Sequence, residues 1–167
     1  DYINDFKLLD ISKEKLLNYD VILLAGVHVP TQNRYFKEID LKKIKDFQGI
    51  VIGIIAGSMN CAHTVYVQPG ESGESLDPNF KRRILGLNLT KQNILPHYQM
   101  VKDYCLDGKK LFEEITYPDS IHHCFLVLED GSYLLSVNNQ ETVYGKSYLL
   151  HDGKLEILCH ENEKCKI

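Results

Sequence analysis

The chain has 167 residues, of which 44% are hydrophobic and 25% are charged, and its formal net charge is −4. This length suits a single hydrophobic core, and the scattered short basic runs do not form the concentrated stripe that nucleic-acid binding needs. No apolar stretch approaches the ~20 residues that cross a bilayer, so we expect neither a nucleic-acid nor a membrane partner.

The amino-terminal part of the sequence alternates helix-like and strand-like segments. Residues 13–19 read as a short capped helix, and residues 35–47 and 57–62 as two further helices. Residues 20–25 and 50–55 are continuous apolar runs, which is the pattern of strands buried on both faces. This order predicts a parallel sheet that is covered by helices on both sides.

The second half of the chain has shorter segments. Residues 65–79 are rich in Gly, Pro, Ser and Glu and predict a long surface loop, while residues 94–95 form a short strand before Pro96. Residues 109–115 are predicted to be helical. Turn residues typical of hairpins then separate five predicted strands: 124–129, 133–137, 142–144, 148–151 and 155–159. An antiparallel meander is therefore expected after the α/β core.

The end of the second predicted strand has the frame of a nucleophile elbow. Gly53 and Gly57 flank Ile55 in a Gly-x-Nuc-x-Gly pattern, in which small residues let the chain turn sharply from strand to helix. Ligands of open α/β sheets bind at the carboxyl ends of the strands. The frame is therefore in the right place for a site, but isoleucine cannot act as the nucleophile.

These residues resemble those of a known family. Residues 53–60 resemble the Gly-x-Ser-Ala-Gly-Ser/Ala-x-Asn elbow of the peptidase E family of serine peptidases, and residues 94–98 resemble its Pro-His-Tyr/Phe segment. Residues 129–133 and 144–145 match its late hairpin region. The resemblance implies a three-layer α/β sandwich with a mostly parallel sheet, like that of class I glutamine amidotransferases, followed by antiparallel hairpins. It also implies one domain over residues 1–167 that lacks the family's first β-α unit.

The resemblance assigns roles by position. Ile55 replaces the nucleophile, His97 is the base, and the amides of Ala56 and of Gly26 or Val27 would form the oxyanion hole. Val27 is a second departure, because relatives usually have glycine there, and a β-branched residue can hinder the backbone orientation that an oxyanion hole needs. No cofactor or metal is implied.

Other residues could complete or replace this machinery. The acidic loop offers three carboxylates as the third triad member, and we favour Glu74 over Glu71 and Asp77. Ser58 and Cys61 follow the elbow within two helical turns, but capping or packing explains each of them better than catalysis. The five cysteines are widely spaced and contain no Cys-x-x-Cys pair, so we expect a cytoplasmic protein without a disulfide framework.

Loss of one triad member costs on the order of 10⁶ in rate. We therefore expect a peptidase E-like serine-type hydrolase homologue that is inactive or much weakened, with small peptides such as aspartyl dipeptides as the substrates of its active relatives. Two alternatives stay open. One is a non-catalytic protein that binds a small molecule or peptide, and the other is a hydrolase in which single-nucleotide changes produced Ile55 and Val27.

Overall fold

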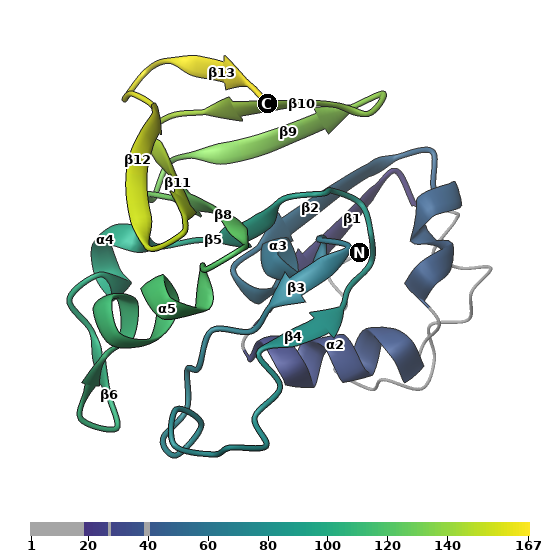
Figure 1. Cartoon of the computed structure of the whole chain (residues 1–167). Coiled ribbons are helices and arrows are strands. Elements are labelled where there is room, and N and C mark those ends of the chain that lie inside the picture. Colours follow the sequence, from purple (N-terminus) through teal and green to yellow (C-terminus); the bar gives the residue numbers. More distant parts are fainter. Residues whose placement is uncertain (1–18, 27, 39–40) are drawn as a thin grey trace.

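The computed structural model describes residues 19–26, 28–38 and 41–167, without the side chains of residues 41–43. Within these ranges the chain forms an α/β structure with several small sheets (Figure 1). The helix expected over residues 13–19 falls almost wholly outside them. Among the helices in the described ranges, none is long and apolar enough to cross a membrane.

The amino-terminal unit confirms the two predicted apolar strands. β1 (Val21–Ala25) and β2 (Ile50–Ile54) are parallel, and α2 (Val29–Glu38) and a 3₁₀-helix (Leu41–Asp46) lie between them in the chain. The helix predicted over residues 35–47 corresponds to α2 and the 3₁₀-helix. It starts earlier than expected because Pro30 suits the first helical turn, where an amide needs no partner. The short helix α3 (Ala56–Asn60) then follows β2 directly.

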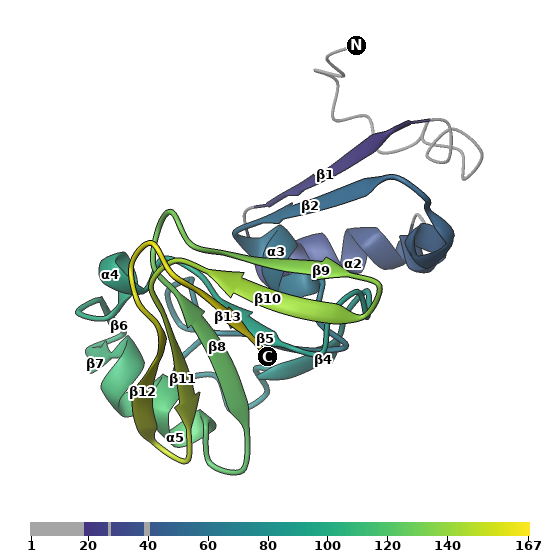
Figure 2. The ribbon, with the colours of Figure 1, turned by 90° about the horizontal axis from the view of Figure 1, so that it is seen from above.

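The expectation that these strands are buried on both faces is wrong for the described part of the chain. Ile22 and Leu24 face the core, where they pack with Phe36 and Ile44. The helices lie on one side of the two strands (Figure 2). The apolar side chains of the opposite face are exposed: Val21, Leu23, Ile50, Ile52 and Ile54.

The rest of the chain forms short strands and short helices. The strands are β3 (Thr64–Tyr66), β4 (Arg83–Leu85), β5 (Asn93–Leu95), β6 (Cys105–Leu106), β7 (Lys109–Lys110), β8 (Cys124–Leu128), β9 (Tyr133–Val137), β10 (Gln140–Tyr144), β11 (Ser147–His151), β12 (Lys154–Cys159) and β13 (Lys164–Lys166). The helices are α4 (Tyr98–Val101), a π-helix (Leu111–Thr116) and α5 (Tyr117–Asp119). One sheet has the order β12-β11-β8-β5 and another β13-β10-β9, while β3-β4 and β6-β7 are two-stranded.

The expected three-layer sandwich with a mostly parallel sheet is therefore wrong. In the described part of the chain, only β1-β2 forms a purely parallel sheet, and β5 is parallel to β8 inside a sheet whose other pairs are antiparallel. Parallel neighbours need a long crossover, whereas tight turns force antiparallel pairing. Asn138 and Asn139 both have positive φ and close β9 onto β10, and Asp152 and Gly153 do the same for β11 and β12.

The predicted strands of the last third are confirmed, but they do not form a simple meander. β8 pairs with β11, while β9 and β10 turn away into the separate sheet (Figure 1). The Asp130-Gly131 turn therefore links two sheets and does not close a hairpin. This arrangement leaves the end of β8 free to lie beside the end of β5.

The two glycines of the elbow frame are required by close packing. A Cβ atom on Gly57 would lie 1.6 Å from the carbonyl oxygen of Leu24 in β1. A Cβ atom on Gly53 would lie 2.8 Å from the Cα atom of Ser58. The bare Cα atoms therefore let α3 press against both β1 and β2.

We predict that Gly57→Ala lowers the free energy of unfolding by about 3 kcal/mol, because the methyl group must push β1 away from α3. Gly70→Ala is a matched control, since no heavy atom lies within 4 Å of its Cβ position. Urea denaturation of both variants and the parent measures the difference. Equal midpoints for the two variants would show that α3 does not pack on β1 this closely.

Candidate active site

Ile55 occupies a sharp turn between β2 and α3. Its backbone has φ 54° and ψ −120°, a conformation that costs roughly 1–3 kcal/mol for a residue with a side chain and most for a β-branched one. Ile55 is 41% exposed, so its side chain is not packed into the core. The turn at Ile55 therefore has the strained strand-to-helix backbone that the Gly-x-Nuc-x-Gly pattern predicts, with a side chain that is not a nucleophile.

Two predicted oxyanion residues lie at this turn. Ala25 pairs with Ile54 across the parallel strands, so Gly26 and Ile55 leave the two strands at the same end. Ala56 is fully buried and begins α3 directly after the turn. Val27 lies outside the described residues. The backbone amides of Gly26 and Ala56 thus belong to adjacent segments beside the nucleophile position.

His97 follows β5 and is held by a carboxylate that the sequence does not single out. Leu95 pairs with Val127 across the parallel strands β5 and β8, which brings the residues after each strand together. The imidazole Nδ1 of His97 is hydrogen-bonded to the carboxylate of Asp130. The amide of Asp130 in turn donates to Gln99 Oε1 at 3.0 Å. His97 therefore has an acidic partner that fixes its ring.

One core connects the elbow with the end of β5. Ala56 and Met59 of α3 and Leu95 of β5 belong to the same buried cluster. Tyr98, next to His97, packs against that cluster and contacts the ring of Phe112 at a centroid distance of 5.0 Å. The backbone around Ile55 and the backbone around His97 are thus supported by the same packed side chains.

Glu74 contacts a different histidine. Its Oε1 lies 2.8 Å from His28 Nε2, and its Oε2 accepts the backbone amides of Gly70 at 2.9 Å and Glu71 at 3.0 Å. One ligand atom each of His28, Glu71 and Glu74 lies within 4.8 Å of the others, a grouping that could hold a metal ion. Because Glu74 already accepts three hydrogen bonds, we interpret its contact with His28 as an anchor that holds the acidic loop in place.

The two alternative nucleophiles, Ser58 and Cys61, both donate hydrogen bonds to backbone carbonyls. The Ser58 hydroxyl donates to the Ile55 carbonyl at 2.6 Å. The Cys61 thiol donates to the Gly57 carbonyl at 3.2 Å, and burial raises its pKa to about 12. A thiol with this pKa stays protonated at neutral pH, and only the thiolate is a good nucleophile. Neither side chain is therefore free to act as a nucleophile beside position 55.

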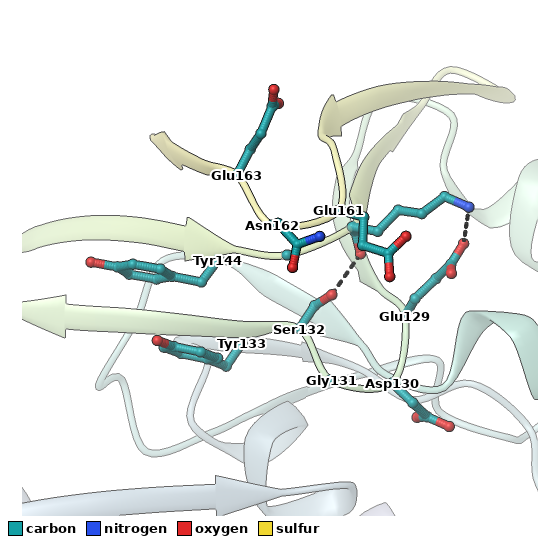
Figure 3. Close-up of a pocket in the computed structure, with 11 residues that line it drawn as sticks. Glu129, Asp130, Gly131, Ser132, Tyr133, Tyr144, Glu161, Asn162 and Glu163 are labelled. Atoms are coloured by element: carbon teal, nitrogen blue, oxygen red, sulfur yellow. Dashed lines mark hydrogen bonds and ion pairs between the residues drawn. The ribbon is translucent and has the colours of Figure 1, made fainter.

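A polar groove of about 400 Å³ adjoins Asp130 (Figure 3). The rings of Tyr133 and Tyr144 stack at one end of it, 4.8 Å apart. Glu129 accepts hydrogen bonds from Tyr148 and Lys146, and these lower the pKa of its carboxyl group. The remaining carboxylates of the lining, among them Glu161 and Glu163, make the groove acidic.

No protein-family model matches this chain, and no curated protein matches it. The resemblance to peptidase E therefore depends on the residues named above and stays a prediction. Sequence patterns alone could not identify Asp130, because its contact with His97 requires the pairing of β5 with β8. The Asp-Gly dipeptide at this position indicates only a turn.

The strain at Ile55 can be measured by comparing two substitutions. We predict that Ile55→Gly is more stable than Ile55→Ala by about 1 kcal/mol, because glycine accepts a positive φ without steric cost. Ile54 is similarly exposed but lies in β2, so Ile54→Gly should be less stable than Ile54→Ala. Thermal and urea unfolding of the four variants provide the comparison. The same order at both positions would contradict the strained turn.

The anchor at Glu74 predicts a dependence of stability on pH. Burial alone would raise the pKa of this carboxyl group, but the amides of Gly70 and Glu71 and the contact with His28 outweigh it and lower the pKa below 4.5. The contact should therefore stabilise the fold above about pH 4.5 and lose its effect as the pH falls through the lowered pKa. Glu74→Gln should remove this effect.

The measurement is urea unfolding of the parent and Glu74→Gln at pH 7 and at successively lower pH. The difference between them should be largest at pH 7 and shrink below about pH 4.5. Glu71→Gln is the control, because only the backbone amide of Glu71 takes part in the contact. A difference that grows on acidification would contradict the lowered pKa.

Proposed function

We propose that this protein is a peptidase E-like serine hydrolase homologue that keeps its catalytic frame and has lost its nucleophile. The observation that carries this proposal is the backbone of Ile55, which is strained at a strand-to-helix turn between two required glycines. Strained residues persist only where the surroundings over-determine them, and they cluster at functional sites. An ordinary turn has no reason to hold a β-branched residue in this conformation.

The neighbouring groups support roles in acyl transfer. His97 would take a proton from a serine at position 55, and Asp130 would orient the imidazole and stabilise its protonated form. The amides of Gly26 and Ala56 would hold the oxyanion. The substrate class is small peptides with amino-terminal aspartate, as the family resemblance implies, and the scattered cysteines favour a cytoplasmic location.

The site supports this function, whereas the overall fold departs from the sandwich that the resemblance implies. The residues that match the family lie after the carboxyl ends of two parallel strand pairs, β1-β2 and β5-β8. Function depends on such a site and not on the layers around it. The parent chain should be inert, because the Ser58 hydroxyl donates to the Ile55 carbonyl and the buried Cys61 thiol has a raised pKa.

The direct test is hydrolysis of Asp-Xaa dipeptides and an aspartyl anilide. We predict that the parent is inactive and that Ile55→Ser, alone or with Val27→Gly, turns these substrates over. Hydrolysis by the parent would contradict the loss of function. Inert restored variants would contradict the peptidase assignment.

The role of Asp130 has its own prediction. In the restored background, Asp130→Asn should lower kcat on the order of 10³–10⁴-fold, because the imidazole loses the carboxylate that orients it. Glu74→Gln should change kcat only a few-fold, since Glu74 contacts His28. The reverse result would make Glu74 the third member of the triad.

A second function is favoured by the acidic groove beside Asp130. Ile55 is partly exposed, and the groove includes Asp130, the partner of His97. A protein that binds peptides without cleaving them would need such a formed surface. Calorimetric titration of the parent with lysyl dipeptides, whose positive charge suits the acidic lining, tests this alternative, which predicts binding that Asp130→Asn weakens.

A further inference from the structure

A buried network of amide side chains connects α2 with α3. Asn60 is fully buried at the end of α3, and its Oδ1 accepts a hydrogen bond from Asn33 Nδ2 at 2.9 Å. Its Nδ2 donates to Gln32 Oε1 at 3.0 Å and to the Val29 carbonyl at 3.2 Å. Both ends of the Asn60 amide are thus satisfied, so Asn60 is held in one orientation and holds Gln32 in turn.

Gln32 in turn holds the backbone at the end of β1. Its Nε2 donates to the carbonyl oxygen of Ala25 at 2.9 Å. A Cβ atom on Gly26 would lie 2.2 Å from Gln32 Nε2, so the amide of Gln32 packs directly on the bare Cα atom of Gly26. Among the described residues, Gln32 makes the only side-chain hydrogen bond to Ala25 or Gly26.

The carbonyl of Ala25 and the amide N–H of Gly26 belong to the same peptide group. In a planar trans peptide these two bonds point in opposite directions. A hydrogen bond that fixes the carbonyl therefore also fixes the direction of the Gly26 N–H. Without it, rotation of this peptide plane could turn the N–H away while the strand before it stays in place.

We propose that Gln32, oriented by Asn60, is a positioning residue that aims the Gly26 amide at the oxyanion. This inference rests on the proposed function, because it concerns one wall of the same site. Ala25 pairs with Ile54 at the end of the two strands, so the fixed peptide lies beside position 55. Gln32 itself does not touch the reacting atoms.

Gln32→Glu tests the role with little change in shape. It keeps the oxygen that accepts from Asn60 but replaces the donor to Ala25 with a second oxygen, which repels the carbonyl. The matched control is Gln48→Glu, because Gln48 also donates to a backbone carbonyl, that of Asp46 at 3.2 Å, but is exposed and lies before β2, at the opposite end of the strand pair from Gly26. Gln32→Ala removes both contacts.

In the Ile55→Ser/Val27→Gly background we expect Gln32→Glu to lower kcat about 100-fold with KM changed less than two-fold, as loss of one oxyanion donor does. Gln48→Glu should leave both constants unchanged. A Gln32→Glu variant that keeps kcat within two-fold of the background would overturn the inference.

A second readout does not depend on activity. Residual dipolar couplings of ¹⁵N-labelled parent protein report the direction of each N–H bond. In Gln32→Glu we expect the coupling of Gly26 to change while those of Leu24 and Ile54 stay the same. An unchanged Gly26 coupling would overturn the inference. If the restored enzyme is inert but the Gly26 coupling changes, the peptidase assignment fails and the positioning role of Gln32 stands.

Discussion

The structure depends on one close contact, that between the bare Cα atom of Gly57 and the carbonyl of Leu24. Because no side chain separates them, α3 lies against β1 and the chain must turn sharply at Ile55, where φ is positive. The same contact brings the start of α3 beside the end of β1. Packing, and not the chemistry of residue 55, therefore holds the backbone of the elbow.

Under the proposed function, this packing explains how the backbone frame of the elbow could persist after the nucleophile was replaced. The Ile55 side chain is partly exposed, so replacing it changes few packed atoms, whereas the glycines cannot change without moving a strand. The proposed base, His97, has independent support, because the pairing of β5 with β8 brings it to Asp130. The frame is thus built from backbone geometry that the core maintains.

The elbow could be predicted from sequence because the spacing of Gly53 and Gly57 is a local signal, and so could the short strands, because turn residues mark their ends. Asp130 could not, since its contact with His97 depends on a strand pair separated by many residues. The prediction of the fold class was wrong for a related reason. Continuous apolar runs such as residues 50–54 do not reveal whether one face or both are covered, and hairpin turns do not say which strands pair across sheets.

The central claim is that an intact hydrolase frame surrounds Ile55. The measurement that tests it most directly is covalent labelling by a fluorophosphonate, followed by mass spectrometry of the labelled peptide. The account predicts that the parent is not labelled, that Ile55→Ser is labelled at position 55, and that His97→Ala in this background slows the labelling by orders of magnitude. Absence of labelling in Ile55→Ser, or labelling that does not depend on His97, would contradict it.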